Sequence, residues 1–194
     1  MAEGVRLDLG CGKNKKEGFI GVDTLAFDGV DIVCNLAELV WNVKPEYNPK
    51  VKEFPLFEAD GVYRFKHDSV DEVYSSHFLE HLTGRERVNF YNELYRILKP
   101  GAKATIIVPH WGSGRAYGDP THQWLPVVEE SFFYLDKGWR EGNAPHCGLD
   151  CNFHAVWWHV IRADWNGKSP EAQAFAVNHY RGVAQDLMAT LTKQ

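Results

Sequence analysis

Leu7-Asp8-Leu9-Gly10-Cys11-Gly12 is the stretch that decides the fold, together with Gly21-Val22-Asp23, whose acid follows Gly12 by eleven residues. The first stretch predicts a short buried strand that runs directly into a glycine turn, and the second predicts a strand that ends in a carboxylate. Two neighbouring parallel strands with such ends form a nucleotide site, because glycine lets backbone N–H groups approach the ligand while the acid accepts hydrogen bonds from both ribose hydroxyls. We therefore predict a site for an adenosine cofactor here.

The length and composition indicate an ordinary globular chain. Its 194 residues suit one domain with a substantial core. A net charge of −5 provides no general basic surface, so binding to nucleic acid is not favoured. The first residues have no secretory pattern and no apolar run approaches membrane-spanning length, so we expect no membrane partner. The cysteines, at 11, 34, 147 and 151, are too unevenly spaced for a disulfide framework, and we expect reduced thiols and a cytoplasmic location.

Strands are predicted at residues 5–9, 18–22, 30–34, 70–75 and 104–109, and an antiparallel strand at 151–163. Only residues 13–18 separate Gly12 from Phe19, which is too short for a full crossover helix. Thr83 and Glu86 form a capping box that opens a helix, and Lys99-Pro100-Gly101 ends it.

A last helix opens at Ser169-Pro170. We expect it to cover the sheet with a face made of Tyr180, Val183, Leu187 and Leu191.

This order of elements predicts an α/β fold: a Rossmann-like, doubly wound, mostly parallel sheet of about seven strands with an antiparallel edge strand. We expect residues 1–194 to form one domain, with 40–65 as an insertion or lid and 110–150 as loops on the substrate side. Ligands of such sheets lie beyond the carboxyl ends of the strands. The polar and glycine residues predicted at those ends are Gly10, Gly12, Asp23, Asn35, Ser75, His77 and His110.

Five passages, in order, resemble the class I S-adenosylmethionine-dependent methyltransferases over most of residues 5–111. They are the glycine stretch 7–12, Asp23, the third strand with its tip at 31–36, the fourth strand with the helix after it at 69–82, and Tyr95-Arg96-Ile97-Leu98-Lys99-Pro100-Gly101. Each passage alone is a weak signal, and all five in sequence are a strong one. Residues 119–124 and 129–133 further resemble a bacterial and phage-type subgroup that has no settled substrate.

The resemblance implies S-adenosylmethionine as the cofactor, methyl transfer to an unidentified acceptor as the reaction, and specific cofactor contacts. The glycine stretch would hold the methionine end, Asp23 the ribose, and the tip at Asn35 the adenine, with Asp60 as a competing match for the adenine. The expected cofactor-binding residues are Asp8, Gly10, Cys11, Gly12, Asp23, Asn35, Leu36, Ser76 and His77. Because the short crossover offers little helix N-terminus to the methionine carboxylate, Lys13, Lys15 or Lys16 is a candidate substitute.

No catalytic residue follows from the pattern. A sulfonium methyl group is already activated, so alignment of the acceptor supplies much of the rate enhancement, and a general base is needed only for a protonated acceptor. His77 and His110 are candidates for that base by location only.

His146, Cys147, Cys151 and His154 suggest zinc. Their spacing is not that of a common zinc finger, and an alternating strand would point the ligands to opposite faces. We expect no metal ligand.

Two other functions remain compatible with these residues. One is a module that binds the cofactor as a sensor or scaffold without transferring methyl, which the short crossover and the lack of an evident catalytic group suggest. The other is a nicotinamide-dependent oxidoreductase, which has the same general fold but normally carries a third glycine that this chain lacks.

Overall fold

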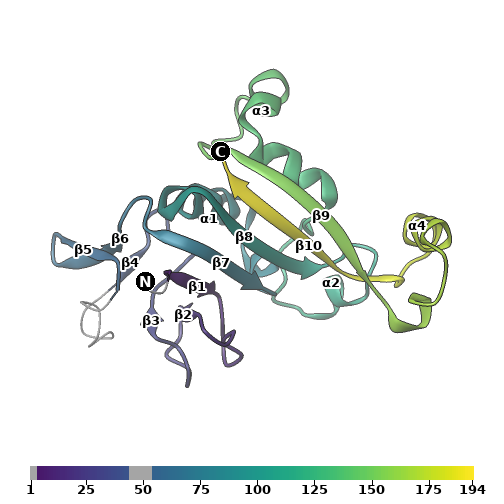
Figure 1. The fold of residues 1–194 in the computed structure, drawn as a ribbon, viewed down its shortest axis with the longest axis horizontal. Coiled ribbons are helices and arrows are strands. Elements are labelled where there is room, and N and C mark those ends of the chain that lie inside the picture. The colour runs from purple at the N-terminus through teal and green to yellow at the C-terminus, as the bar shows by residue number, and fades with distance from the viewer. Residues whose placement is uncertain (1–3, 44–53) are drawn as a thin grey trace.

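The structure, a computed structural model, describes residues 4–43 and 54–194. Its main sheet has seven strands in the order β3-β2-β1-β7-β8-β10-β9 (Figure 1). The first five strands in this order are parallel neighbours, whereas β10 runs antiparallel to both β8 and β9. The strands are β1 (Arg6–Leu9), β2 (Ile20–Asp23), β3 (Ile32–Val33), β7 (Val70–Ser76), β8 (Leu98–Pro109), β9 (Phe153–Ile161) and β10 (Ala184–Lys193). The predicted mostly parallel α/β sheet of about seven strands is confirmed, and its antiparallel edge, predicted as one strand, consists of the pair β10 and β9.

The strand β1 lies where the order of the sheet changes direction. The chain goes from β1 outward to β2 and β3, and then returns to β7 on the other side of β1. Leu7 and Leu9 point to the same face of β1 and are fully buried, and Asp8 between them is 2% exposed. Ligands of open α/β sheets bind at the carboxyl ends of the strands at such a switch point, which here is the glycine turn.

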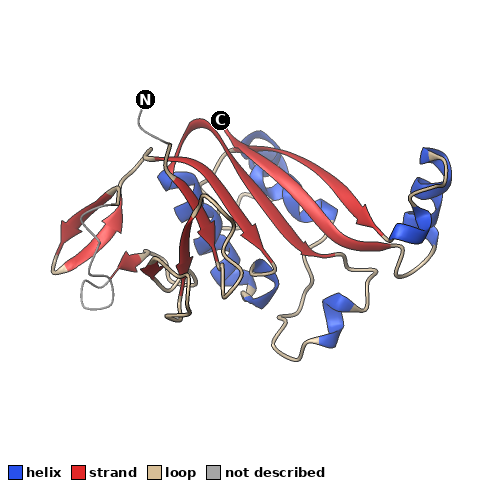
Figure 2. Ribbon diagram, turned by 60° about the horizontal axis from the view of Figure 1, so that its bottom comes forward, coloured by secondary structure: helices blue, strands red, loops and turns tan. Residues whose placement is uncertain are grey.

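The crossover from β1 to β2 is short, whereas the crossover from β7 to β8 contains a helix. Residues 10–19, which connect β1 to β2, contain no helix, as the sequence predicted. The helix α1 (Gly84–Ile97) connects β7 to β8 and begins at the predicted capping box, in which Thr83 accepts from the Glu86 backbone. Figure 2 shows α1 packed on one face of the sheet, whereas the other face of the central strands carries no helix among the described residues.

A second, three-stranded sheet has the order β4-β6-β5 and consists of β4 (Asn42–Val43), β5 (Leu56–Ala59) and β6 (Val62–Phe65). Trp41 and Phe65 join it to the main core, since their rings contact each other and Trp41 also contacts Phe90 of α1. This small sheet occupies the predicted insertion at 40–65, of which residues 44–53 lie outside the described part.

The prediction of a long last helix is wrong. The helix α4 (Pro170–His179) begins at the predicted Ser169 cap, but residues after Gly182 form the strand β10. Leu187 and Leu191 match a helical spacing, yet burial along this segment alternates with a period of two from Leu187 onward. This segment is a strand because it pairs with β8 on one side and β9 on the other. The local spacing of apolar residues carries no information about such pairing.

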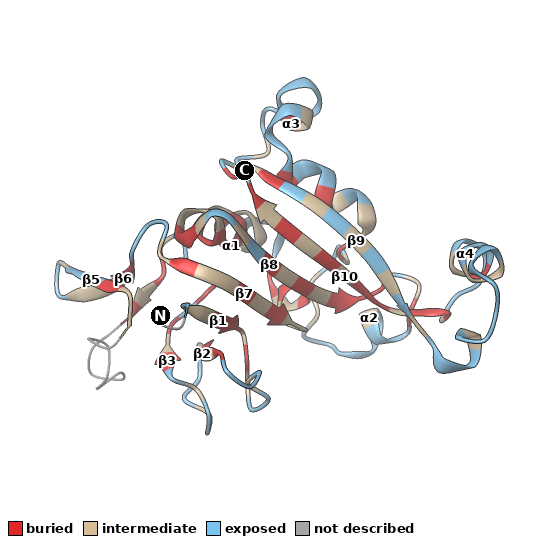
Figure 3. Ribbon diagram, viewed as in Figure 1, coloured by how far each residue is buried: buried red, intermediate tan, exposed pale blue. Residues whose placement is uncertain are grey.

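The segment 110–150 contains short helices rather than loops alone. They are α2 (Arg115–Gly118), η4 (Glu129–Leu135) and α3 (Lys137–Asn143), and two further single turns are η3 (Leu79–His81) and η5 (Ala163–Trp165). Figure 3 shows that buried residues concentrate in the central strands and α1, while α3 and α4 are mostly exposed. Within residues 4–43 and 54–194, no helix has both the length and the apolar character needed to cross a bilayer.

Candidate functional site

The glycine turn after β1 needs glycine for two reasons. Gly10 has a φ of +73° and Gly12 a φ of +53°, a region that side chains rarely adopt. A Cβ on Gly10 would also lie 2.3 Å from the ring of Phe78, which follows β7. The Gly10 N–H donates to the carbonyl of Val22 on β2 at 2.8 Å, so the turn is closed over the neighbouring strand.

Asp23, at the end of β2, is joined to this turn. Its Oδ2 accepts a hydrogen bond from the Gly12 N–H at 2.9 Å, and its Oδ1 accepts one from the Leu25 N–H at 3.1 Å. These bonds orient the carboxylate, and each oxygen keeps acceptor capacity for a hydroxyl group. The sequence prediction that the two segments meet is therefore confirmed.

Asp8 supplies a buried negative charge beneath the turn. Its side chain is 2% exposed, and Oδ2 accepts the Lys16 N–H at 2.7 Å. Burial raises the pKa of Asp8, and the Lys16 hydrogen bond only partly offsets this. A cationic ligand group, such as the ammonium of an amino acid, would compensate the buried carboxylate. The donor set thus fits the methionine end of the expected cofactor.

A cavity of about 380 Å³ opens between the glycine turn and the end of β7. Six of the nine predicted cofactor residues line it, namely Asp8, Gly10, Cys11, Gly12, Ser76 and His77. Two further lining residues, Asn14 and Tyr74, are not among the predicted cofactor residues. Burial raises the pKa of the Cys11 thiol to about 12, so Cys11 lines the cavity as a neutral group rather than a nucleophile.

The three lysines of the crossover take different positions. Lys15 forms an ion pair with Asp31 at 2.8 Å, and the ammonium of Lys16 lies 4.0 Å from the centre of the Tyr74 ring. Lys13 is the lysine that lines the cavity. The Lys13 ammonium lies 5.5 Å from the centre of the Phe27 ring, so a role for Lys13 as the carboxylate partner stays a prediction.

The expected adenine contacts lie at the next strand end. Asn35 follows β3 and is exposed, and its Oδ1 accepts the Ala37 N–H at 3.1 Å. Leu36 is buried in the core, so any adenine contact has to come from its backbone. Asp60 lies in the turn between β5 and β6 of the second sheet. Asn35 therefore has the strand-end position that an adenine contact needs, and its role stays a prediction.

His77 directly follows β7, has a φ of +55° and is not part of a helix. Its Nδ1 lies 3.2 Å from Glu80 Oε1, and Arg115 Nη2 lies 3.4 Å from its Nε2. Because an arginine only donates, Nε2 is the acceptor and Nδ1 carries the proton. Asp186 holds Arg115 by an ion pair at 2.9 Å. No sequence signal placed Arg115 and Asp186 beside His77, because they come from α2 and β10.

His110 follows β8 and is 3% exposed. Its Nδ1 accepts the Gly112 N–H at 3.0 Å, and its Nε2 lies 3.2 Å from Glu129 Oε1, which His159 Nε2 also approaches to 2.6 Å. Both ring nitrogens are therefore engaged within the protein. Of the two histidines proposed as a base, His77 is the one that lines the cavity.

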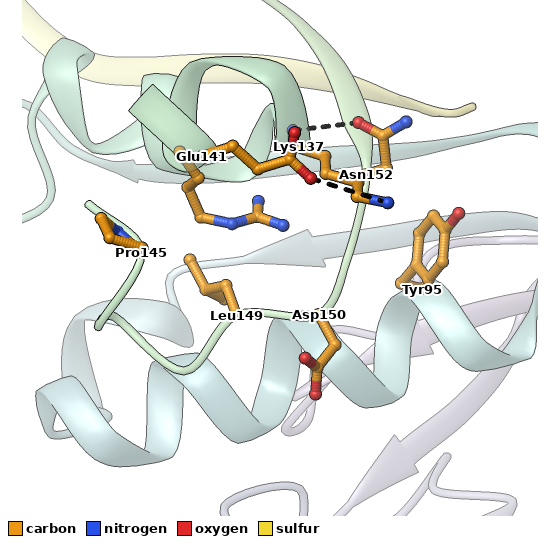
Figure 4. A pocket seen from close by; sticks show the side chains of 8 residues that line it. Tyr95, Lys137, Glu141, Pro145, Leu149, Asp150 and Asn152 are labelled. Atoms are coloured by element: carbon orange, nitrogen blue, oxygen red, sulfur yellow. Dashed lines mark hydrogen bonds and ion pairs between the residues drawn. The ribbon is translucent and has the colours of Figure 1, made fainter. Parts of the chain in front are cut away.

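A larger cavity, of about 440 Å³, lies between α1 and the α3 region (Figure 4). Its polar contacts are a hydrogen bond from the Lys137 N–H to Asn152 Oδ1 at 3.0 Å and an ion pair from Lys137 to Glu141 at 3.8 Å. Tyr95, on its wall, donates to the carbonyl of Gln194 at the end of β10. Because β10 runs antiparallel to β8, the end of β10 lies beside the amino end of β8. This cavity is therefore at the amino ends of the parallel strands, at the opposite edge of the sheet from the glycine turn.

The arrangement as a whole is that of a Rossmann-like nucleotide-binding protein: seven strands in this order, with a glycine turn and a strand-end acid at the switch point. The family model described as Methyltransferase domain matches residues 7–106, just over half of the chain. The chain belongs to this family, within class I of the S-adenosylmethionine-dependent methyltransferases. The expectation drawn from the five passages is confirmed.

Known proteins resemble this chain to different extents. Phosphoethanolamine N-methyltransferase 2 of Caenorhabditis elegans is 28% identical over 108 residues, which cover 55% of this chain but only 23% of that relative. A SAM dependent methyltransferase from Archaeoglobus fulgidus has a TM-score of 0.59 at 21% identity, covering 99% of this chain and 87% of its own. The 1,6-didemethyltoxoflavin-N1-methyltransferase of Burkholderia thailandensis has a TM-score of 0.55 at 14% identity, covering 98% and 71%. These structural matches establish the fold.

Proposed function

We propose that the whole protein transfers the methyl group of S-adenosylmethionine to a nucleophilic acceptor, and that the cavity at the glycine turn holds this cofactor. One observation carries the proposal: the glycine turn, the buried Asp8 and the strand-end Asp23 converge at the switch point of the sheet. The cofactor, when bound, supplies an activated methyl group on a sulfonium. The chain's own task is then to bind and orient the reactants.

The residues around the cavity have distinct proposed roles. Asp23 would accept the ribose hydroxyls with a carboxylate that Gly12 and Leu25 already orient. Asp8 would face the ammonium of the amino-acid end, and Lys13 its carboxylate. Ser76 and His77 line the side at β7, and Asn35 with the backbone of Leu36 would meet the adenine.

His77 is the candidate general base for an acceptor that must lose a proton. Its Nε2 carries a lone pair but accepts from Arg115, so Arg115 has to release it before it takes a proton. Arg115 is about half exposed and is held by Asp186 from β10. The cytoplasmic location, the role of residues 40–65 as an insertion or lid, and the expectation that nucleic acid is not a favoured partner stay predictions.

Calorimetric titration with S-adenosylhomocysteine tests the cofactor site. We expect the wild-type protein to bind it and Asp23→Asn to lose about 1.5–3 kcal/mol of affinity, roughly ten- to a hundredfold, because two charge-assisted hydrogen bonds become weaker. Asp28→Asn, an exposed acid five residues further on, is the matched control and is expected to bind like wild type. An absence of binding by the wild-type protein would contradict the proposal.

A second measurement separates an enzyme from a binding module. The protein is incubated with S-adenosylmethionine and a broad panel of acceptors, and S-adenosylhomocysteine formation is measured. We expect turnover with at least one acceptor class. Tight binding without turnover across the panel would favour the sensor or scaffold alternative.

A further inference from the structure

A second group of side chains lies next to the cofactor cavity, on its β8 side. Glu80 and His81 belong to η3, and His122 follows α2, yet one ligating atom of each lies within 4.8 Å of the others. They line a cavity of about 340 Å³, which His77 and Asp119 also line. His77 lines both this cavity and the one at the glycine turn, so the two spaces are neighbours.

The Glu80 carboxylate has a buried oxygen without a partner. Glu80 is 5% exposed, and its Oε1 faces His77 Nδ1, but Oε2 accepts no hydrogen bond from any described residue. The guanidinium of Arg87 attracts Glu80, but it donates through Nε to the carbonyl of Leu79 and through Nη1 to that of Leu125, and its buried Nη2 has no partner among the described residues. A buried carboxylate oxygen without a partner is costly, and a bound cation would remove that cost.

Both histidines use Nδ1 for their hydrogen bonds, which leaves Nε2 for a metal, and His122 Nε2 lies 4.0 Å from Asp119 Oδ2. His122 Nδ1 lies 3.1 Å from the carbonyl of Ala116, which only accepts, so Nδ1 carries the proton. Thr121 Oγ1 donates its one proton to Asp119 Oδ1 at 2.7 Å and therefore accepts from His81 Nδ1 at 3.0 Å. Histidines that ligate metals usually donate their other N–H to such an outer partner, which fixes the tautomer.

The other group of two histidines and a glutamate does not have this property. His110 Nδ1 accepts the Gly112 N–H, so the proton is on Nε2, the nitrogen that faces Glu129. A protonated Nε2 donates a hydrogen bond and cannot ligate a metal. The His110–Glu129–His159 group is thus held together by hydrogen bonds alone.

We propose that Glu80, His81 and His122 bind a divalent transition-metal ion of the Zn²⁺ class. Two neutral imidazole nitrogens and one carboxylate oxygen form a donor set that leaves positions open for another ligand. His77 lines the same cavity as the three ligands and also lines the cofactor cavity, so an acceptor bound to the ion would lie near the cofactor site. On the proposed function, an oxygen or nitrogen donor of the methyl acceptor would take such a position, which would orient the acceptor beside the methyl group.

The test is a titration of the full-length, chelator-treated protein with Co²⁺, without cofactor, followed by visible absorption and calorimetry. We expect one Co²⁺ per chain with ligand-field bands that Zn²⁺ abolishes. His122→Asn is expected to lower the affinity by more than about 10–100-fold, the range that loss of an outer hydrogen bond to a ligating histidine alone causes. His159→Asn, in the hydrogen-bonded group, is the matched control and is expected to retain wild-type affinity.

His81→Asn is the second ligand variant, in case His122→Asn does not fold. Calorimetry with S-adenosylhomocysteine reports separately on the cofactor site, so a failure of the proposed function and a failure of the metal site are distinguishable. No stoichiometric Co²⁺ binding by the wild-type protein overturns the proposal. Wild-type affinity in both folded ligand variants, or a loss of affinity in His159→Asn instead, overturns it as well.

Discussion

At the scale of single residues, Gly10 and Phe78 form the contact between the two sides of the cofactor cavity. The ring of Phe78 lies where a side chain on Gly10 would be, and it also contacts Phe90 of α1. The backbone of the turn therefore packs directly on the first residues after β7. This close approach explains why the turn is built from glycine, in addition to its positive φ.

Gly10→Ala is expected to destabilise the protein and abolish cofactor binding. A left-handed conformation costs a non-glycine residue about 1–2 kcal/mol, and the clash with Phe78 adds a cost of the order of 1–3 kcal/mol for overpacking. Gly29→Ala, at a φ of +94° with open space around it, carries only the first cost. Urea unfolding and calorimetry with S-adenosylhomocysteine measure both effects. Equal stability losses in the two variants would contradict the role of Phe78.

Glu129 depends on two histidines from different elements. Burial favours a higher pKa for Glu129, but the hydrogen bonds from His110 and His159 outweigh it and hold the pKa well below its ordinary value. A carboxyl group with a lowered folded pKa stabilises the protein fully above its unfolded pKa of about 4.3. That contribution is lost as the pH falls through the folded pKa.

We therefore expect the difference in unfolding free energy between wild type and Glu129→Gln to shrink as the pH falls below about 4. Chemical unfolding between pH 3 and pH 7 measures it. Glu130→Gln, at an exposed neighbouring position, is expected to show no such dependence. A difference that grows towards acid pH would contradict the assignment.

At the scale of elements, the two capped helices differ in how they contribute to the fold. The helix α1 has a full capping box at Thr83 and packs Phe90, Leu94 and Ile97 into the core. The helix α4 has a Ser169 cap of the same chemistry, but Ala176 is its one buried residue and it projects beyond the ends of β9 and β10 (Figure 1). We therefore expect the N-cap of α1 to contribute more to the global stability than the N-cap of α4.

Thr83→Ala is expected to lower the global unfolding free energy by about 1 kcal/mol, as loss of an N-cap typically does. Ser169→Ala is expected to have a smaller effect on global unfolding, because α4 can fray without opening the core. Urea unfolding monitored by tryptophan fluorescence compares the two. Equal effects would show that α4 unfolds together with the core.

At the scale of the whole molecule, the sheet is covered unequally. The helix α1 packs on one face, and the other face of the central strands carries no helix within the described residues (Figure 2). On β10 the residues that face the core, such as Leu187 and Leu191, are fully buried, while Met188 and Thr190 between them are partly exposed. Only one face of β10 therefore packs into the core.

Leu187→Ala is expected to cost about 2–5 kcal/mol, the range for a large apolar side chain removed from a packed core. Met188→Ala, one residue further on and on the open face, is expected to cost clearly less. Unfolding of both variants in urea tests the strand assignment, because a helix would place the two side chains only 100° apart. Similar costs for both substitutions would contradict the arrangement.

The features that could be predicted from the sequence are those that depend on interactions between residues close together in the chain. A glycine turn, a capping box and an acid at a strand end depend on φ angles and on hydrogen bonds that span a few residues, so Gly10, Thr83 and Asp23 were identified before the fold was known. The family resemblance added the set of expected cofactor residues. Six of the nine expected cofactor residues line one cavity as a result.

The remaining features depend on contacts between segments that are distant in the chain. The strand β10 forms because β8 and β9 offer free edges on both sides of it, which outweighs a helical spacing of apolar residues. Arg115 and Asp186 reach His77, and His122 reaches Glu80, only after the loops and the last strand have folded onto the carboxyl ends of β7 and β8. Local patterns carry no information on such pairs, because the free energy that selects them comes from packing across the sheet.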